Sequence, residues 1–270
     1  MAHASGDAPM GVMAVSLLGR FSLRINGQGE VRLSDKARQL LAYLLVYQAR
    51  GQPRERLAQS IWDSAADDAG ELLRRALEEL ETALEGHVAP GLLVEQGDTW
   101  ISLADGADLH VDLWAFVEGA SAYDGPTPSL LDETALPSAV ATERLYQGHL
   151  LEGWTEPWCR EPRERAARLY ALLLDTLIAT YEAAEDLTKV VLYATRSLAA
   201  DPGQERAHRA LIHALHRLGD RTGALHQVER CLVALRAAGG REPGPETQAL
   251  IDIVRAEPPG GARSASRKAL

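Results

Sequence analysis

The sequence has few cysteines and no long apolar run, and each shortage excludes a class of protein. Two cysteines, Cys159 and Cys231, in 270 residues are too few for a disulfide framework, so we expect reduced and mostly buried thiols. No run of about eighteen apolar residues is present, so we expect no segment that spans a membrane. The first residues, MAHASGDAPMGVM, lack a basic region followed by an apolar one and do not form a signal peptide. We therefore expect a cytoplasmic protein.

The motifs of common enzyme classes are also absent. The chain has no Gly-rich phosphate loop (GxxxxGK or GxGxxG), no GxSxG elbow, and no HExxH or DxDxDG metal motif. Paired carboxylates are frequent, but on the surfaces of expected helices. His213 and His216 have a spacing that suits metal ligands, yet no Cys, Asp or Glu completes a set, so we expect structural or exposed histidines. The sequence predicts a protein that is not an enzyme and that has no cofactor and no metal site.

Positive charge is scarce as well. The chain has 28 Lys and Arg against 38 Asp and Glu, a formal net charge of −10. Such a balance does not favour non-specific binding to nucleic acid, so any DNA contact must come from a local patch. Aromatic residues make up only 5% of the chain, whereas Ala and Leu are abundant, and this composition indicates mostly helix. The length suffices for two modest domains.

The N-terminal third alternates between strand and helix patterns. Asn26-Gly27 is a strong hairpin-turn signal, Ser34 is an expected helix N-cap, and Pro53 is expected in the first turn of a short helix. Gly97-Asp98 is the expected turn of a second hairpin. In order, the pattern predicts strands at 15–25 and 30–33, helices at 35–48, 54–62 and 67–86, and a hairpin at 92–103.

The helix expected over residues 67–86 is the centre of this region. Its apolar residues recur at intervals of three and four, which is one face of a helix: Leu73, Ala76, Leu77, Leu80 and Leu84. The opposite face carries Glu71, Arg74, Arg75, Glu78, Glu79, Glu81 and Glu85. A helix between a helix-turn-helix pattern and a hairpin has the position of a winged-helix recognition helix. The acidic charge of its outer face opposes contact with a polyanion.

From Asp108 onward the pattern predicts only helices. They are expected at 110–122, 133–146, from Glu161-Pro162 to beyond Tyr181, and at 187–200, 204–218, 222–237 and 246–255. A shift of 34 residues places Leu177 on Leu211 and Tyr181 on Leu215, and 34 is the tetratricopeptide period. Helix pairs of this kind stack and leave a concave groove that suits a helix or an extended peptide.

Two features of the segment before the long helix have structural explanations. Trp154 and Trp158 are expected to pin the irregular segment 153–162 onto the helical layer rather than to form an aromatic platform. A basic run follows and consists of Arg160, Arg163, Arg165 and Arg168. We expect a solvated helix face here; the functional alternative is contact with an acidic partner, a phosphate or DNA.

The order of these pieces resembles a known family. The segments KARQLLAYLL and RERLAQSIW, the central helix and the hairpin resemble an OmpR-type winged helix. The segments LYQGHLLEGWTEPWCREPRERAARLY and REPGPETQAL resemble the bacterial transcriptional activator domain. Joined in this order, they resemble SARP-type (AfsR-like) bacterial transcriptional regulators. The resemblance implies binding to double-stranded promoter DNA through the winged helix, a side-by-side homodimer on direct repeats, and recruitment of RNA polymerase.

The predicted fold is therefore mainly α with a small β component. Residues 1–11 are an expected tail and 258–270 another. Residues 12–106 form the expected winged-helix domain, and 107–257 the expected all-α, tetratricopeptide-like activator domain.

The candidate DNA contacts follow from this arrangement. Arg74 and Arg75, in the first turns of the central helix, can read guanine in the major groove. The candidate phosphate contacts are Lys36, Arg38, Arg54 and Arg56. Against DNA binding, Glu71, Glu78 and Glu79 have the spacing to pair with the two arginines. Glu81 and Glu85 have no basic neighbour on the helix, and family members usually carry more arginines here.

Two other functions remain open. In one, the winged helix has lost DNA binding, and the chain is a protein-interaction module that acts through its acidic helix and the helical groove. In the other, the helical domain is the pocket of a small-molecule sensor. The helical domain is also the expected contact for RNA polymerase or another regulatory protein.

Overall fold

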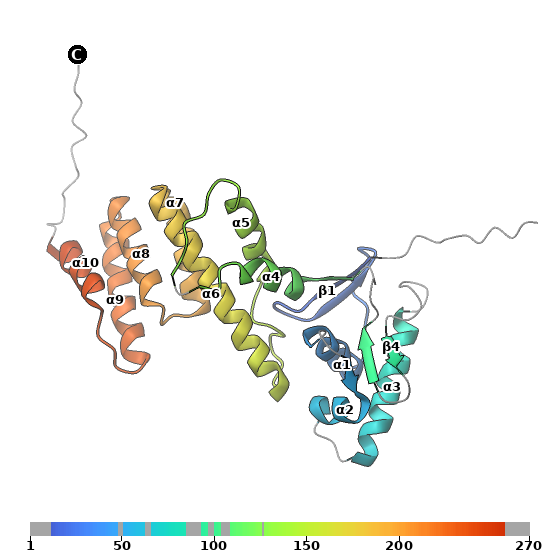
Figure 1. The fold of residues 1–270 in the computed structure, drawn as a ribbon. Coiled ribbons are helices and arrows are strands. Elements are labelled where there is room, and N and C mark those ends of the chain that lie inside the picture. The colour runs from blue at the N-terminus through green and yellow to red at the C-terminus, as the bar shows by residue number, and fades with distance from the viewer. Residues whose placement is uncertain are drawn as a thin grey trace, which may run out of the picture. The chain divides into compact units, whose positions relative to one another are not determined.

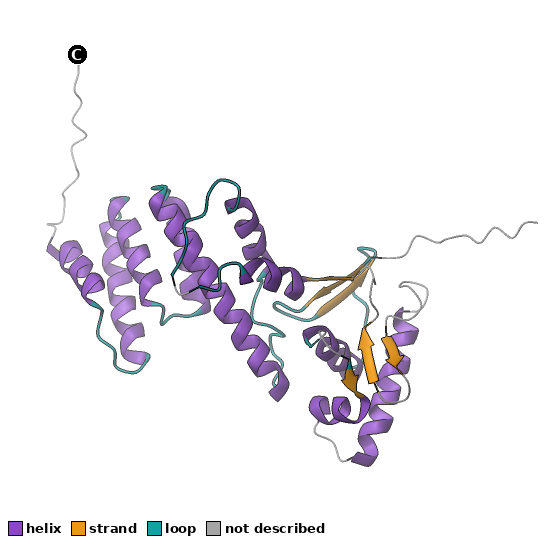
Figure 2. Cartoon of the chain, viewed as in Figure 1, coloured by secondary structure: helices purple, strands orange, loops and turns teal. Residues whose placement is uncertain are grey.

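The computed structural model describes residues 12–47, 51–62, 66–84, 93–96, 100–103, 109–125 and 127–256 (Figure 1). The fold is mainly helical with short strands, as predicted (Figure 2). The strands are β1 (Met13–Ser16), β2 (Ser22–Ile25), β3 (Gln52–Pro53), β4 (Leu93–Gln96), β5 (Trp100–Leu103) and β6 (Leu109–Val111). The helices are α1 (Asp35–Val46), α2 (Arg54–Trp62), α3 (Ala66–Leu84), α4 (Asp112–Ser121), α5 (Leu136–Leu145), α6 (Arg160–Ala183), α7 (Leu187–Ala200), α8 (Glu205–Arg217), α9 (Arg221–Ala237) and α10 (Pro245–Ala256). Among the described residues, no helix is long and apolar enough to cross a membrane.

The chain packs into two units that are not contiguous in sequence. The first unit comprises Met1–Glu118 together with Arg144–Ala167, and the second comprises Gly119–Glu143 together with Arg168–Leu270. The division at residues 106 and 107 remains a prediction about the sequence domains. Packing places a later segment, 144–167, with the N-terminal region.

The first sheet of the first unit has the strand order β2-β1-β6. The prediction of a single strand over residues 15–25 is wrong. This stretch folds back, and β1 and β2 pair antiparallel, with Met13 opposite Ile25. Gly19, with a φ of 108°, lies in the reversal, a backbone conformation that glycine adopts without strain. The Asn26-Gly27 turn forms as expected, but the return segment contributes only an isolated bridge between Arg24 and Glu30.

A parallel strand, β6, completes this sheet where a helix was expected. Leu109–Val111 pairs with Met13–Val15, so the helix predicted from residue 110 begins only at Asp112. The Asp112 carboxylate accepts hydrogen bonds from the backbone N–H groups of Leu17 (2.8 Å) and Leu18 (3.1 Å). This carboxylate therefore fixes the end of β1 to the start of α4. Burial raises the pKa of Asp112, and the backbone donors oppose that rise.

The remainder of the N-terminal region has the elements of a winged helix. Ser34 caps α1 as predicted, because its side chain accepts from the backbone N–H of Ala37. α3 packs on α1 and α2, and a second sheet has the order β3-β5-β4. Pro53 lies in β3 rather than in the first turn of α2, which begins at Arg54. β3 is an edge strand, where the missing N–H of proline is tolerated.

The helices of the second unit repeat with the predicted period. Asp186 caps α7 and Asp220 caps α9, each by accepting a backbone N–H three residues later. The residues just before these caps, Glu185 and Gly219, both have positive φ. The paired caps lie 34 residues apart, so the shift predicted from apolar positions is also present in the backbone. α8, α9 and α10 share a buried core that includes Ile212, Val228, Cys231 and Ile251. Cys231 is one of the two free, buried cysteines.

Candidate nucleic-acid interface

The central helix α3 has the two faces that its sequence predicts. Its apolar stripe is buried, with at most 5% of each side chain exposed: Leu73, Ala76, Leu77, Leu80 and Leu84. The outward residues Glu71, Arg74, Arg75, Glu78 and Glu81 are exposed. Burial of the stripe against α1 and α2 fixes which side of the helix faces outward.

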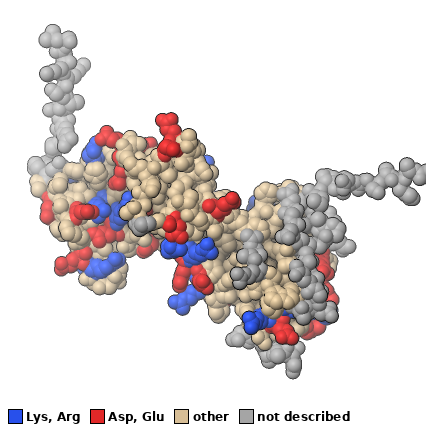
Figure 3. All heavy atoms as spheres, in the orientation of Figure 1, with Lys and Arg blue, Asp and Glu red and all other residues tan. Residues whose placement is uncertain are grey.

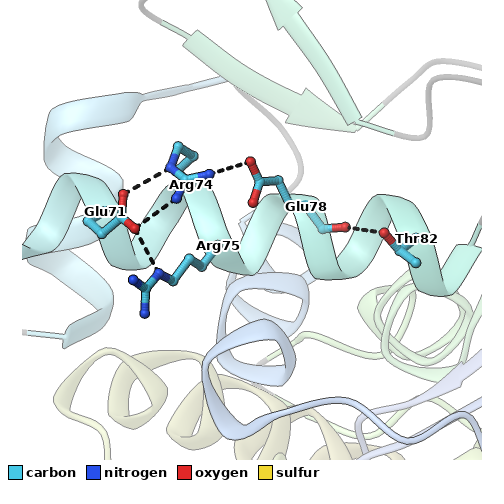
Figure 4. Close-up of polar contacts among 5 residues, drawn as sticks. All are labelled: Glu71, Arg74, Arg75, Glu78 and Thr82. Atoms are coloured by element: carbon cyan, nitrogen blue, oxygen red, sulfur yellow. Dashed lines mark hydrogen bonds and ion pairs between the residues drawn. The ribbon is translucent and has the colours of Figure 1, made fainter.

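The two candidate base-reading arginines share one carboxylate. Arg74 donates to both oxygens of Glu71, at 2.9 Å from Nε and 2.7 Å from Nη2, and Arg75 Nε donates to Glu71 at 2.7 Å (Figure 4). Arg74 also pairs with Glu78. Hydrogen bonds from Arg74 and then Arg75 lower the pKa of Glu71 to about 2. The carboxylate is thus charged at neutral pH, and both guanidinium groups are held over the first turns of α3.

Glu79 does not pair with Arg75, which corrects the expectation from spacing. Its carboxylate accepts from the backbone N–H of Ser34 at 2.6 Å and from the Ser34 hydroxyl at 2.5 Å. The negative charge therefore lies at the N-terminus of α1, where the helix dipole and free N–H groups favour an anion. The carboxylate of Glu79 therefore binds the start of α1 rather than an arginine of α3.

Glu81 remains exposed on α3, and no ion pair of Glu81 occurs within the described part of the chain. This agrees with the absence of a basic residue at helical spacing. Glu85 and the turn predicted at Gly97-Asp98 lie outside the described residues.

The four candidate phosphate contacts lie on α1 and α2, and at least two have local partners. Lys36 Nζ lies 5.4 Å from the centroid of the Trp62 ring, and Arg38 pairs with Asp35. Arg54 and Arg56 occupy the first turn of α2, and Arg56 is exposed. The structure thus joins Arg74 and Arg75 through Glu71 and places the other four on the two neighbouring helices.

The two tryptophans before α6 pack against α1 and Phe21. Trp158 lies edge-on to Tyr43, with ring centroids 5.2 Å apart, and its carbonyl accepts from the Tyr47 hydroxyl at 2.8 Å. Trp154 lies 5.9 Å from the Phe21 ring. The two tryptophans therefore hold the segment 153–162 in place as expected, and Trp158 packs on α1.

The basic run contains one structural residue that the sequence did not distinguish. Arg163 donates to the carbonyls of Leu150 (2.8 Å), Leu151 (3.0 Å) and Trp154 (3.0 Å). Arg160 pairs with Glu164 at the surface, as a solvated helix face would. The sequence does not distinguish Arg163 from the other arginines of the basic run, because the three carbonyls that it binds belong to an irregular segment.

Charge elsewhere is mixed. On the face drawn in Figure 3, acidic and basic side chains are interspersed over the helices of the second unit rather than gathered in one patch. Among the described residues, no three His, Cys, Asp or Glu side chains form a group that could hold a metal ion.

Three helices with a β-hairpin, followed by stacked helical hairpins, are the architecture of SARP-type transcriptional regulators. The family model described as the bacterial transcriptional activator domain matches residues 111–255, more than half of the chain, and the chain belongs to this family. Members of the family are transcription regulators, which confirms the prediction that the chain is not an enzyme.

A solved structure extends the likeness beyond the matched domain. Mycobacterium tuberculosis EmbR, in complex with a low-affinity phosphopeptide, aligns with a TM-score of 0.62 and 20% sequence identity. The alignment covers 92% of this chain and 66% of that chain, so this chain spans slightly less than two thirds of the EmbR chain. At this identity the likeness shows the fold, including the N-terminal region that precedes residue 111. No curated protein sequence matches the chain.

Proposed function

We propose that the chain binds promoter DNA through the first turns of α3. The observation that carries this proposal is the exposure of Arg74 and Arg75 on the face opposite the buried stripe, in the helix that precedes the β4–β5 hairpin. In winged helices this part of the helix enters the major groove. The ion pairs with Glu71 and Glu78 are exposed and screened by solvent, so contacts with bases or phosphates can replace them.

Phosphate contacts complete the proposed interface. Arg54 and Arg56 lie at the N-terminus of α2, and Lys36 and Arg38 lie in the first turn of α1. Arginine, lysine and helix N-termini are the usual donors to phosphate oxygens. These contacts position the protein on the duplex and supply most of the salt dependence.

The proposed role of the helical domain is contact with protein. It dimerises the chain and offers a surface to RNA polymerase or another regulator in the cytoplasm. The support is the repeat of helix pairs α6–α7 and α8–α9, an architecture that presents extended surfaces to partners.

Fluorescence anisotropy across a salt series tests DNA binding directly. The duplex is taken from the DNA upstream of the protein's own coding sequence, with a scrambled duplex as the reference. We expect preference for the native duplex and affinity that falls steeply with salt. Replacing Arg74 and Arg75 by Ala should reduce that preference by about tenfold or more, since a good bidentate base contact contributes about 1–3 kcal/mol.

Arg217→Ala is the matched control, because Arg217 is also an exposed arginine paired with a glutamate and lies on α8, outside the basic run. It should bind both duplexes as the wild type does. Equal loss of affinity in the control, or no binding by the wild type at low salt, would contradict recognition by α3.

The unpaired carboxylate of Glu81 supports a second candidate function. An acidic outer face on α3 suits a basic protein partner, and the chain would then act as a protein-interaction module. Replacing Glu81 and Glu85 by Lys separates the two functions. If α3 lies along a duplex, DNA binding tightens because two repulsive charges become attractive; if α3 is a protein interface, DNA affinity stays unchanged.

A further inference from the structure

A cavity of about 770 Å³ lies within the first unit, away from the proposed DNA contacts of α3. The end of α1, strand β3, helix α4 and the start of α6 form its walls. Leu113, Val117 and Ala166 contribute apolar surface. A volume within about 300–1,000 Å³ and a mainly apolar lining are typical of sites for small organic ligands.

The polar atoms of the two aromatic residues in the lining already form hydrogen bonds within the protein. Trp114 Nε1 donates to the carbonyl of Leu45 at 2.8 Å, and the Tyr47 hydroxyl donates to the carbonyl of Trp158 at 2.8 Å. Their remaining contribution to the cavity is the aromatic ring itself. Aromatic faces attract organic cations, and they favour neutral apolar groups over anions.

The charged residues of the lining are unpaired and mainly acidic. Glu118, Glu161 and Arg165 all line the cavity and are exposed. None of the three forms an ion pair or hydrogen bond in the described part of the chain. Glu161 lies close enough to Tyr47 to raise the pKa of that phenol, although burial is the larger cause of the rise to about 12. A carboxylate and an aromatic residue, Glu161 and Tyr47, therefore both line the cavity.

We propose that this cavity is an effector site for a small organic cation, an amine with an aromatic or aliphatic body. The apolar lining and the rings take the body, and the carboxylates of Glu118 and Glu161 take the ammonium group. Charge complementarity selects the cation over an anion, since two carboxylates outnumber the single guanidinium of Arg165.

The cavity also reaches the element that joins the hairpin to α2. Gln52 lines the cavity and belongs to β3, where it pairs with Ile101 of β5, and Arg54 begins α2 two residues later. A bound amine thus contacts the strand that positions the hairpin and the N-terminus of α2. Binding of the amine does not depend on whether α3 binds DNA.

Isothermal titration calorimetry on the full chain tests the site with two probes, tryptamine and hexylamine. Their neutral analogues tryptophol and hexanol carry the same bodies without the charge. We expect at least one amine to bind. Its neutral analogue should bind at least about threefold more weakly, because it lacks the one or two partly exposed ion pairs that the ammonium group forms with the carboxylates. Absence of binding by both amines at millimolar concentration overturns the proposal, and so does equal binding of amines and alcohols.

Variants locate the site. Replacing Glu118 and Glu161 by Gln should weaken amine binding about three- to tenfold and leave alcohol binding unchanged. Glu164→Gln, on the same helix but outside the lining, is the matched control and should bind like the wild type. Val117→Phe, which reduces the space, should weaken binding of amine and alcohol alike. Unchanged amine binding in the double Gln variant overturns the proposal.

Discussion

Glu79 connects two helices that are far apart in sequence. Its carboxylate holds both the backbone N–H and the hydroxyl of Ser34, and the same hydroxyl caps α1. The spacing of Glu79 from Arg75 suits an intrahelical pair, yet the folded chain offers a better partner. Sequence spacing identifies partners on one helix, but the N-terminus of another helix becomes available only when α1 and α3 pack.

Replacing Glu79 by Ala should destabilise the first unit by about 1–2 kcal/mol, since the backbone N–H and the hydroxyl of Ser34 lose their acceptor. Urea unfolding followed by circular dichroism measures the change. Glu81→Ala removes an exposed carboxylate from the same helix and should change stability by less than about 0.5 kcal/mol. Equal effects of the two substitutions would show that the Ser34 contact contributes nothing.

Arg163 holds three carbonyls of the segment that precedes α6. Arg163→Met keeps the aliphatic length but leaves these carbonyls without a charged donor, so we expect a loss of at least about 2 kcal/mol. Arg165→Met on the same helix removes only an exposed charge and should be close to neutral. Thermal unfolding of both variants gives the comparison, and similar melting temperatures would refute a structural role for Arg163.

His208 is buried between two neutral partners. Its Nε2 lies 3.0 Å from the carbonyl of Pro202 and its Nδ1 lies 2.6 Å from Nε2 of Gln227, an arrangement that uses the neutral ring as one donor and one acceptor. Burial lowers the pKa of His208. In the unfolded chain the ring takes up a proton near pH 6.5, whereas the folded protein resists protonation until lower pH.

The stability that His208 contributes is therefore present above about pH 6.5 and is lost as pH falls towards the folded pKa. Melting temperatures measured between about pH 7.5 and about pH 5.5 should fall more steeply for the wild type than for His208→Gln, which does not titrate. His213→Gln is the control for a histidine of the same helix. Parallel pH profiles for the wild type and His208→Gln would contradict this assignment.

At the scale of elements, helix faces and caps were predictable and strand pairing was not. The buried stripe of α3, the Ser34 cap and the 34-residue repeat follow from local periodicity and capping chemistry. β6 was missed because three residues next to Asp112 pair with β1 across almost one hundred positions, and no local pattern records that contact. The candidate site was predictable as a helix face, whereas the partner of Glu79 required the packed structure.

The crossing of α4 and α5 depends on one glycine. A Cβ at Gly119 would overlap Oγ1 of Thr142, a buried β-branched residue with little freedom to move. Alanine has the higher helix propensity, but the overlap costs more than that gain.

Gly119→Ala should therefore destabilise the second unit by about 1–3 kcal/mol. Thr142→Ala relieves the overlap, so the double variant should be more stable than the sum of the two single changes predicts, with a coupling of at least about 0.5 kcal/mol. Chemical unfolding of the four proteins completes the cycle. Additive effects would mean that the helices shift apart without strain.

At the scale of the whole molecule, the predicted winged-helix boundary can be tested as a fragment. Residues 12–106 lack β6 and the segment that supplies Leu150, Trp154 and Trp158. In the full chain, Leu17 and Gly19 bond to the backbone of that segment, and Tyr43 packs on Trp158. A fragment that ends at residue 106 should therefore unfold at lower temperature than one that ends at residue 183, in thermal scans of both. A fragment of equal stability would show that the first 106 residues fold alone.

The first unit combines two separate stretches of the chain, and this affects when it is complete during synthesis. The ribosome releases the three N-terminal helices before β6, Leu150 and Trp158, yet the first unit is complete only with residues 144–167. At a synthesis rate of about 5–20 residues per second, several seconds pass between release of α3 and release of Ala167. During that interval Leu17 and Tyr43 lack their partners Leu151 and Trp158. Completion of the first unit thus waits for synthesis of residues 144–167, so a chain that stops before residue 144 lacks part of that unit.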